Sequence, residues 1–266
     1  MTPYPNLISD SLLINETIQL LRSFGGRASV VKVVDYVMKI QKAEPSLARL
    51  LVSDLVDADP RLLLNNDTVE LIKCSSERRN FAKTDFVVFD LETTGAKTPP
   101  CRITEIGAFR VSDGKIVAEF QTLVNPETPI PQFISELTGI TDQMVKGAPK
   151  FCEVAEDFLG FIGDSVLVAH NAHFDMRFLN HEIGRIFEDY RVGNPHLCTV
   201  QLSRKLLPDI GNHRLNTVAS HYSIQLIRHH RAGDDARATA HIFVNLLEAL
   251  HNIGVKDLEA AKKFKV

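Results

Sequence analysis

Asp90 and Glu92 are two carboxylates whose spacing lets them act on one ligand. They follow the apolar run 86–89, which predicts a buried strand. Side chains at positions i and i+2 of a strand point to the same face, so this pair can share a divalent cation. The strand then opens into a loop at residues 93–95, where backbone amides can approach a phosphate. Acidic residues at a strand end are also commonly just solvated, so the pair alone does not decide the function.

A second cluster, residues 170–175, reads His-Asn-Ala-His-Phe-Asp and follows the apolar run 166–169. Asp175 is predicted to lie in the first turn of a helix, where the helix dipole favours an anion. An aspartate at that position is also ordinary capping chemistry. By itself this cluster leaves the structural and the functional interpretation open.

A third cluster, residues 229–236, combines two histidines with two aspartates just before and inside a predicted helix start near Gly233. An imidazole beside a carboxylate suits a general base next to a metal ligand. Adjacent histidines can also be simple surface polarity, and the residues alone do not separate the two.

Other chemistries lack their motifs. The chain contains neither a GxxxxGK[ST] phosphate-binding loop nor a GxSxG nucleophile elbow. His181-Glu182 begins an HExxH pattern, but Arg185 occupies the place of the second histidine. A zinc-protease helix is therefore excluded.

Composition narrows the class of protein further. The chain has 266 residues, 44% hydrophobic and 24% charged, which predicts a soluble globular protein of about two domains. A net charge of −3 neither demands nor forbids a polyanionic partner. No apolar run is long enough for a membrane span, the N-terminus lacks a secretory pattern, and the four cysteines form no CxxC pair. We expect a cytoplasmic protein with reduced thiols and no membrane partner.

The N-terminal elements that precede the clusters form a small domain of their own, residues 1–74. An amphipathic helix is predicted at 9–24, a second helix is capped by Ser29, and a third is opened by Pro45. Residues 61–72 predict a β-hairpin. Three helices followed by a hairpin resemble a winged-helix domain in layout. The polar residues 75–84 are predicted to be a linker.

Residues 85–266 predict a second domain, which carries all three clusters. Strands are expected at 86–89, 103–111, 116–124, 166–170 and 196–200. Helices are expected at 151–162 and 173–188 and in two stretches towards the C-terminus. Strands interleaved with helices indicate an open α/β layer structure.

Taken together, the three clusters resemble the DEDDh class of 3′→5′ exonucleases, the group that includes the proofreading epsilon subunit of bacterial DNA polymerase III. The matching motifs are residues 89–95, 170–175 and 230–236, and the stretches 103–108 and 137–141 also look like that family. The resemblance covers roughly residues 85–250 and no part of 1–80. It implies a ribonuclease-H-like mixed sheet flanked by helices, and hydrolysis of terminal phosphodiester bonds to release nucleoside 5′-monophosphates.

The resemblance also assigns roles to individual residues. Two divalent ions, Mg²⁺ or Mn²⁺, would be held by four carboxylates, which tolerate one another only when cations neutralise them; these are Asp90, Glu92, Asp175 and Asp235. His230 would accept the proton of the attacking water. By the family's pattern the candidates to line the terminal nucleotide are Leu91, Thr93, His170, Asn171 and Phe174.

The expected substrate is a nucleic acid with a 3′ end, single-stranded DNA being favoured over RNA, and any polymerase partner is unspecified. The alternative is a nucleic-acid-binding or regulatory module with an inert nuclease fold, which the complete ligand set argues against. The N-terminal domain is not expected to read duplex DNA, because residues 1–80 contain ten basic and ten acidic side chains. We expect it instead to make dimer or partner contacts, or to orient the nuclease.

The register of the last long helix separates two candidate pairs, His229/Asp234 and His230/Asp235. Asp235 shares its helical stripe with Thr239, Ile242, Leu246 and Ala249, which must pack on the sheet. Asp234 shares a mostly polar stripe that should face water. We therefore expect His230 and Asp235 to act in the reaction and His229 and Asp234 to be dispensable.

Overall fold

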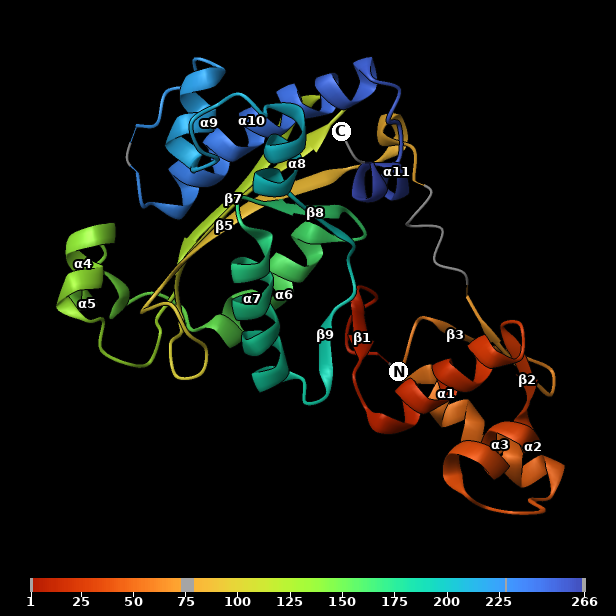
Figure 1. Cartoon of the computed structure of the whole chain (residues 1–266). Helices are drawn as coiled ribbons and strands as arrows, with labels where there is room; N and C mark the ends of the chain where they lie inside the picture. The colour runs from red at the N-terminus through yellow and green to blue at the C-terminus, as the bar shows by residue number, and fades with distance from the viewer. Residues whose placement is uncertain (1, 73–78, 228, 265–266) are drawn as a thin grey trace. The chain divides into compact units, whose positions relative to one another are not determined.

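The structure is a computed structural model that describes residues 2–72, 79–227 and 229–264. It divides into two compact units, each treated separately below (Figure 1). The first combines the N-terminal residues with Ile183–Gly193, and the second contains the described remainder of the chain. No described helix combines the length and the apolar character needed to cross a membrane.

The N-terminal unit has the predicted three helical segments and hairpin. Their bounds are α1 Leu12–Ser23, α2 Val30–Val33 with a π-helical continuation Val34–Met38, α3 Pro45–Asp57, β3 Leu62–Asn65 and β4 Thr68–Leu71. The hydroxyl oxygen of Ser29 accepts the Lys32 N–H and caps α2. A strand that the sequence did not predict, β2 Arg27–Ser29, completes a sheet of order β2-β4-β3. The winged-helix assignment itself stays a prediction.

A second sheet of this unit was also not predicted. β1 Leu7–Ser9 pairs antiparallel with β9 Tyr190–Val192, which comes from far along the chain. Asp59 lies beside this sheet, buried, and its carboxylate accepts the backbone N–H of Ser9 at 2.8 Å. The Arg61 guanidinium binds both Asp59 and the Ser9 carbonyl, so β1 is fixed to the end of α3.

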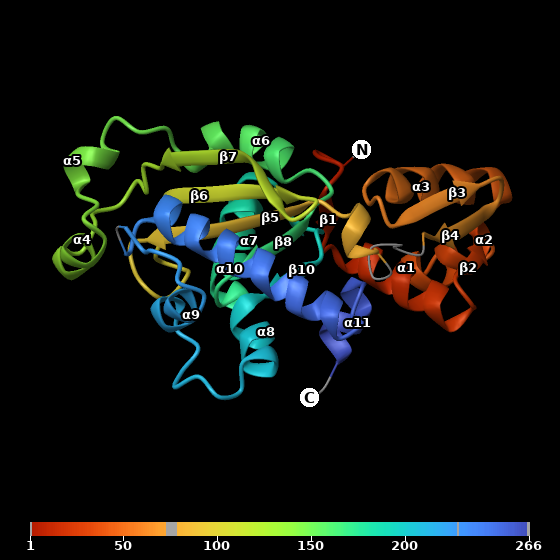
Figure 2. The same ribbon diagram turned by 90° about the horizontal axis from the view of Figure 1, so that it is seen from above.

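The second unit is built on one five-stranded mixed sheet of order β10-β8-β5-β6-β7 (Figure 2). The bounds are β5 Phe86–Thr93, β6 Ile103–Ser112, β7 Lys115–Leu123, β8 Val166–Ala169 and β10 His196–Cys198. β6 pairs antiparallel with both β5 and β7, whereas β8 is parallel to β5 and β10 is parallel to β8. This confirms the ribonuclease-H-like mixed sheet.

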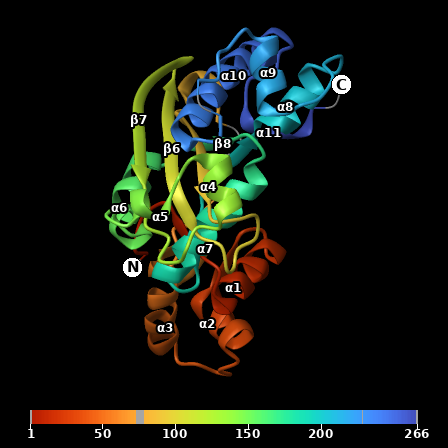
Figure 3. The ribbon, with the colours of Figure 1, turned by 90° about the vertical axis from the view of Figure 1, so that its left-hand side faces the viewer.

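Helices cover both faces of that sheet (Figures 1 and 3). α6 Phe151–Ile162 packs through Phe158 on Phe89 and Phe120, and α7 Ala172–Ile186 lies on the same side (Figure 1). The opposite face carries α8 Thr199–Leu206, α9 Leu215–His221, α10 Ala232–Asn252 and α11 Leu258–Lys263. A hydrophobic core cluster lies under these four helices and includes Phe86, Phe109 and Phe243.

Some local details differ from the expected elements. Within the predicted linker 75–84, Phe81–Lys83 form a 3₁₀ turn whose Phe81 ring packs on Phe86; residues 75–78 lie outside the described chain. The loop after β7 contains two short helices, α4 Gln132–Thr138 and α5 Asp142–Val145. The strand expected at 196–200 ends at Cys198, where α8 begins. Cys101, Cys152 and Cys198 are free thiols, and Cys74 lies outside the described residues.

Candidate active site

Three of the predicted metal ligands converge at one end of β5. Asp90 and Glu92 point from the same face of that strand, and Asp235 reaches them from the first turn of α10. One oxygen from each of the three carboxylates lies within 4.8 Å of the others. The i, i+2 spacing on the strand and the helix register together produce this cluster. Asp235 is buried, whereas Asp234 is half-exposed.

Asp175 completes the group from the first turn of α7. Its side chain is buried, and its Oδ1 accepts the backbone N–H of Leu91 at 3.2 Å. Leu91 stands between Asp90 and Glu92, so this hydrogen bond attaches the start of α7 to the centre of the cluster.

The carboxylates strongly perturb one another. Burial, and then the negative charges of Asp175 and Glu92, raise the pKa of Asp90 well above its usual value. Burial followed by the charge of Asp235 raises the pKa of Glu92 to about 8. Burial raises the pKa of Asp175 to about 7. At neutral pH the cluster cannot hold all of its charge unless a cation compensates it.

The position of α10 is set by two residues of β6 that lie opposite the cluster. Gly107 is paired with Asp90 and Glu105 with Glu92 across the β5–β6 ladder. A Cβ at Gly107 would lie 2.4 Å from the backbone carbon of Ala232, so only glycine lets α10 approach this closely. The cluster therefore depends on close contact between β6 and the α10 N-terminus.

Glu105 holds that same helix end by hydrogen bonds. Its carboxylate accepts the backbone N–H of Ala232 at 2.9 Å and forms a two-point ion pair with Arg231, 2.7 Å at the shorter contact. Glu105 is buried. Sequence reasoning assigned no role to Glu105, Gly107 or Arg231. A charged residue among the apolar residues of a predicted strand was the signal that could have pointed to Glu105.

Both histidines of the third cluster lie against Asp235. His229 Nδ1 is 3.1 Å from Asp235 Oδ1, and His230 donates its backbone N–H to Oδ2 at 3.0 Å. The two imidazole rings stack with centroids 4.0 Å apart. Burial, and then the neighbouring His229, lower the pKa of His230. Ligand atoms of His229, His230 and Asp235 lie within 4.8 Å of one another, and the dispensability of His229 stays a prediction.

The five candidate substrate residues differ in how far their side chains are exposed. Leu91 and Thr93 are buried, and Thr93 donates its hydroxyl to the Gly95 carbonyl. His170 is held by Thr199, with 2.9 Å between Nδ1 and Oγ1, and burial lowers its pKa to about 4. Asn171 is exposed, and the half-exposed Phe174 ring packs on Phe178. Asn171 and Phe174 thus have more surface to offer a nucleotide than Leu91 and Thr93.

A family model described as "Exonuclease", RNase_T, matches residues 87–243. The chain belongs to this exonuclease family. The matched range contains all four carboxylates and both histidines of the third cluster, and it identifies the second unit as an exonuclease domain.

Part of the sequence of bacterial DNA polymerases is also similar to this chain. DNA polymerase III PolC-type from Caldanaerobacter subterraneus subsp. tengcongensis is 47% identical over 174 residues, which are 65% of this chain and 12% of that protein. The Bacillus subtilis PolC-type polymerase is 40% identical over 185 residues, 70% of this chain and 13% of the polymerase. The chain thus spans about an eighth of the length of these relatives.

Solved structures share the fold. Exonuclease X in complex with 5′ overhanging duplex DNA is 28% identical, with a TM-score of 0.54 over 66% of this chain and 98% of that one. The nuclease domain of 3′hExo, a DEDDh family member bound to rAMP, is 19% identical with a TM-score of 0.55, over 66% of this chain and 95% of that one.

The exonuclease family implies divalent metal ions, generally Mg²⁺ or Mn²⁺, and the residues present fit such ions. The donor set consists of carboxylate oxygens, which hard divalent cations prefer. Burial raises the pKa values of Asp90, Glu92 and Asp175, so a bound cation would favour their ionised forms.

Proposed function

We propose that the chain hydrolyses the terminal phosphodiester bond at a nucleic-acid 3′ end and releases nucleoside 5′-monophosphates, with two divalent ions at the carboxylate cluster. One observation carries the proposal: ligand oxygens of Asp90, Glu92 and Asp235 lie within 4.8 Å of one another. Buried Asp175 is attached to the same strand through Leu91. If these carboxylates were merely solvated, their mutual repulsion would not favour such close approach.

The metal ligands in this proposal are Asp90, Glu92, Asp175 and Asp235. When bound, the ions supply neutralising charge, activation of a water molecule and stabilisation of the leaving 3′ oxygen. His230 accepts the proton of the attacking water. Its lowered pKa keeps the imidazole neutral and able to accept a proton at neutral pH. Glu105 and Arg231 keep the start of α10, and with it Asp235, in position.

The proposed substrate is DNA, with single-stranded 3′ ends favoured. The curated relatives are DNA polymerases, and one structural neighbour was solved with 5′ overhanging duplex DNA. RNA is the second candidate, because another neighbour is bound to rAMP. The relatives also support an association with DNA synthesis, in which the nuclease removes nucleotides from the growing 3′ end. The residues proposed to line the terminal nucleotide are Leu91, Thr93, His170, Asn171 and Phe174.

A 5′-labelled single-stranded oligonucleotide with Mg²⁺ or Mn²⁺ tests this function. We expect a ladder that shortens from the 3′ end, mononucleotide release, and no reaction in EDTA. Asp90→Asn should be inactive while retaining the fold. Binding without hydrolysis by the parent protein would favour the inert regulatory module instead, which the complete ligand set disfavours.

For the N-terminal unit we propose contacts with protein rather than sequence-specific contacts with duplex DNA. The outer face of α3 exposes Leu47 and Leu50. The one arginine of α3, Arg49, is paired with Asp67 at 3.2 Å, so its charge is already compensated. In the full chain, Arg49→Ala should leave the affinity for blunt duplex DNA unchanged. A clear fall in that affinity would contradict the proposal.

A further inference from the structure

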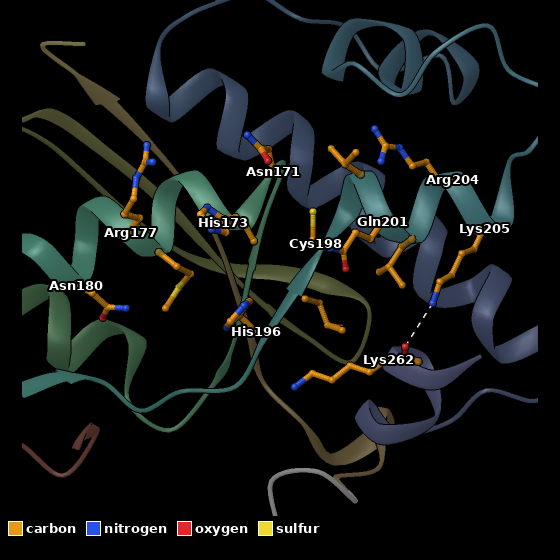
Figure 4. Close-up of a pocket in the computed structure, with 16 residues that line it drawn as sticks. Asn171, His173, Arg177, Asn180, His196, Cys198, Gln201, Arg204, Lys205 and Lys262 are labelled. Carbon is orange, nitrogen blue, oxygen red and sulfur yellow. Dashed lines mark hydrogen bonds between the residues drawn. The ribbon is translucent and has the colours of Figure 1, made fainter. Parts of the chain in front are cut away.

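A basic pocket lies beside the carboxylate cluster without including any of its four ligands. Its volume is about 720 Å³, within the range of small-ligand sites. It is bounded by α7, β10, α8 and α11 (Figure 4). The ionisable groups lining it are Arg177, Arg204, Lys205 and Lys262, with His173 and His196; no aspartate or glutamate lines this described pocket. Four positive charges gather here although the whole chain has a net charge of −3.

The pocket extends from the second catalytic motif. Asn171, which immediately precedes α7, lines it, and the α7 wall continues through His173, Met176, Arg177 and Asn180. These positions recur every three or four residues and form one helical stripe, about 10 Å long. Asp175 belongs to the same helix but points to the cluster and not into the stripe. A strand leaving the cluster over the start of α7 would therefore enter the basic pocket.

The opposite wall is fixed to the same motif. The imidazole of His170 contacts the hydroxyl of Thr199, the first residue of α8, at 2.9 Å. Two of the cations are also held in place: Arg177 donates to the Ala96 carbonyl at 2.7 Å, and Lys205 donates to the Lys262 carbonyl at 3.4 Å. Two of the four positive charges are thus held in position, which favours a built binding surface over a set of unrelated surface lysines.

We propose that this pocket binds the phosphodiester backbone of the substrate strand, on the 5′ side of the nucleotide being removed. The inference rests on the proposed function and extends it, because Lys262 lies beyond residues 87–243 of the exonuclease match. Four cations without a neighbouring carboxylate suit a repeating anion, and counterion release makes such contacts strongly salt-dependent. The other occupant that fits the charge is an acidic peptide lying along β10, the edge strand of the sheet.

The test compares a minimal substrate with longer ones in the full-length protein. Hydrolysis of the p-nitrophenyl ester of thymidine 5′-monophosphate measures the activity of the carboxylate cluster alone. Hydrolysis of oligothymidylates of three to twelve nucleotides also measures the contribution of the basic pocket. The variant is Arg204→Gln/Lys262→Gln, which changes two exposed side chains and spares Arg177 and Lys205. The matched control, Lys115→Gln/Lys146→Gln, removes two exposed charges of the same unit outside the pocket.

The expected result is a KM for the twelve-nucleotide substrate that rises several-fold in the pocket variant, with kcat and ester hydrolysis unchanged. The slope of log KM against log salt should fall by about 0.7 for each lost contact, hence about 1.4 in total. The control variant should keep the parent slope. The single variant Lys262→Gln should show about half of the change in salt slope expected for the double variant.

An unchanged salt slope in the pocket variant would overturn the proposal. So would an equal loss of ester hydrolysis, because the residues would then serve the cluster or the fold. Loss of affinity for an acidic decapeptide with unaltered oligonucleotide kinetics would reassign the pocket to a peptide. If the parent protein hydrolyses neither the ester nor the oligonucleotides, the proposed function itself has failed.

Discussion

His229 and Asp235 form a direct side-chain contact, with 3.1 Å between the imidazole Nδ1 and the carboxylate Oδ1. His230, the next residue, reaches the other oxygen of Asp235 through its backbone N–H at 3.0 Å and has a left-handed backbone, with φ of 65°. The two histidines thus use different groups to contact the same carboxylate. In the proposed mechanism the imidazole of His230 accepts a proton, while that of His229 contacts a proposed metal ligand.

His230→Ala should reduce kcat by about 10²–10⁴-fold, the loss expected when a proton acceptor is removed. KM should change little, because the ring is assigned to the chemical step and not to binding. Steady-state kinetics on a single-stranded oligonucleotide at saturating Mg²⁺ measure both quantities.

His229→Ala is the matched comparison. We expect kcat within about tenfold of the parent, since the backbone contact from His230 to Asp235 persists. The neighbouring His229 is one of the causes that lower the pKa of His230, so its removal should shift the acidic limb of the kcat profile to higher pH. A larger kcat loss in His229→Ala than in His230→Ala would assign the role of proton acceptor to His229 instead of His230.

Asp235→Asn should lower the rate by two or more orders of magnitude, because it removes a ligand charge from a cluster of three carboxylates. Asp234→Asn, one position earlier on α10, should stay within a few-fold of the parent. Activity titrated against Mn²⁺ gives a second readout, in which only Asp235→Asn should need more metal. Equal effects of the two substitutions would contradict the helix register.

Without metal, the free energy of unfolding should fall as the pH rises from about 5 to 8.5. The folded pKa values of Glu92 and Asp175, about 8 and about 7, lie above those of the unfolded chain. A carboxyl group with a raised folded pKa stabilises the fold below its unfolded pKa, and that stability is lost as the pH passes the folded value.

Thermal unfolding in EDTA and in Mg²⁺ across this pH range tests the expectation. Added metal should raise Tm more at pH 8 than at pH 5, because it binds the ionised cluster. Asp90→Asn should flatten the pH dependence in EDTA. A Tm in EDTA that rises across this range would mean that the carboxylates are compensated by groups of the protein itself.

Gly107→Ala should destabilise the fold by about 1–3 kcal/mol and reduce activity, because the added Cβ would lie 2.4 Å from the Ala232 backbone. Denaturant unfolding and kcat measure the two effects. Gly160→Ala is the control, since Gly160 is an exposed residue of α6 and nothing lies within 4 Å of the new Cβ. That change should leave activity intact and raise stability by up to about 1 kcal/mol.

Local pattern was enough to predict the elements that carry the proposed metal ligands. The apolar run before Asp90, the capping role of Ser29 and the stripe through Asp235 each depend on a few neighbouring residues, and the structure agrees with them. What the sequence did not predict depends on partners distant in the chain. β1 and β9 are three residues each and exist only through their mutual pairing, so neither carries a pattern of its own.

The same limit applies to the site. The place of Asp235 beside Asp90 depends on Gly107 and Glu105, which contact the first residue of α10. No pattern in the sequence relates residue 107 to residue 232. The contact of His229 with Asp235 depends on the left-handed backbone of His230, a conformation that histidine seldom adopts and that spacing alone does not reveal.

The pairing of β1 with β9 sets an order of events during synthesis. Leu7 leaves the ribosome early, but its partner Val192 is translated 185 residues later. At about 5–20 residues per second, the first strand waits roughly 10–40 s for the second. The N-terminal unit therefore completes its hydrogen bonding only after most of the nuclease sheet has been translated, and a chain truncated before residue 190 would present β1 as an unpaired edge to chaperones and proteases.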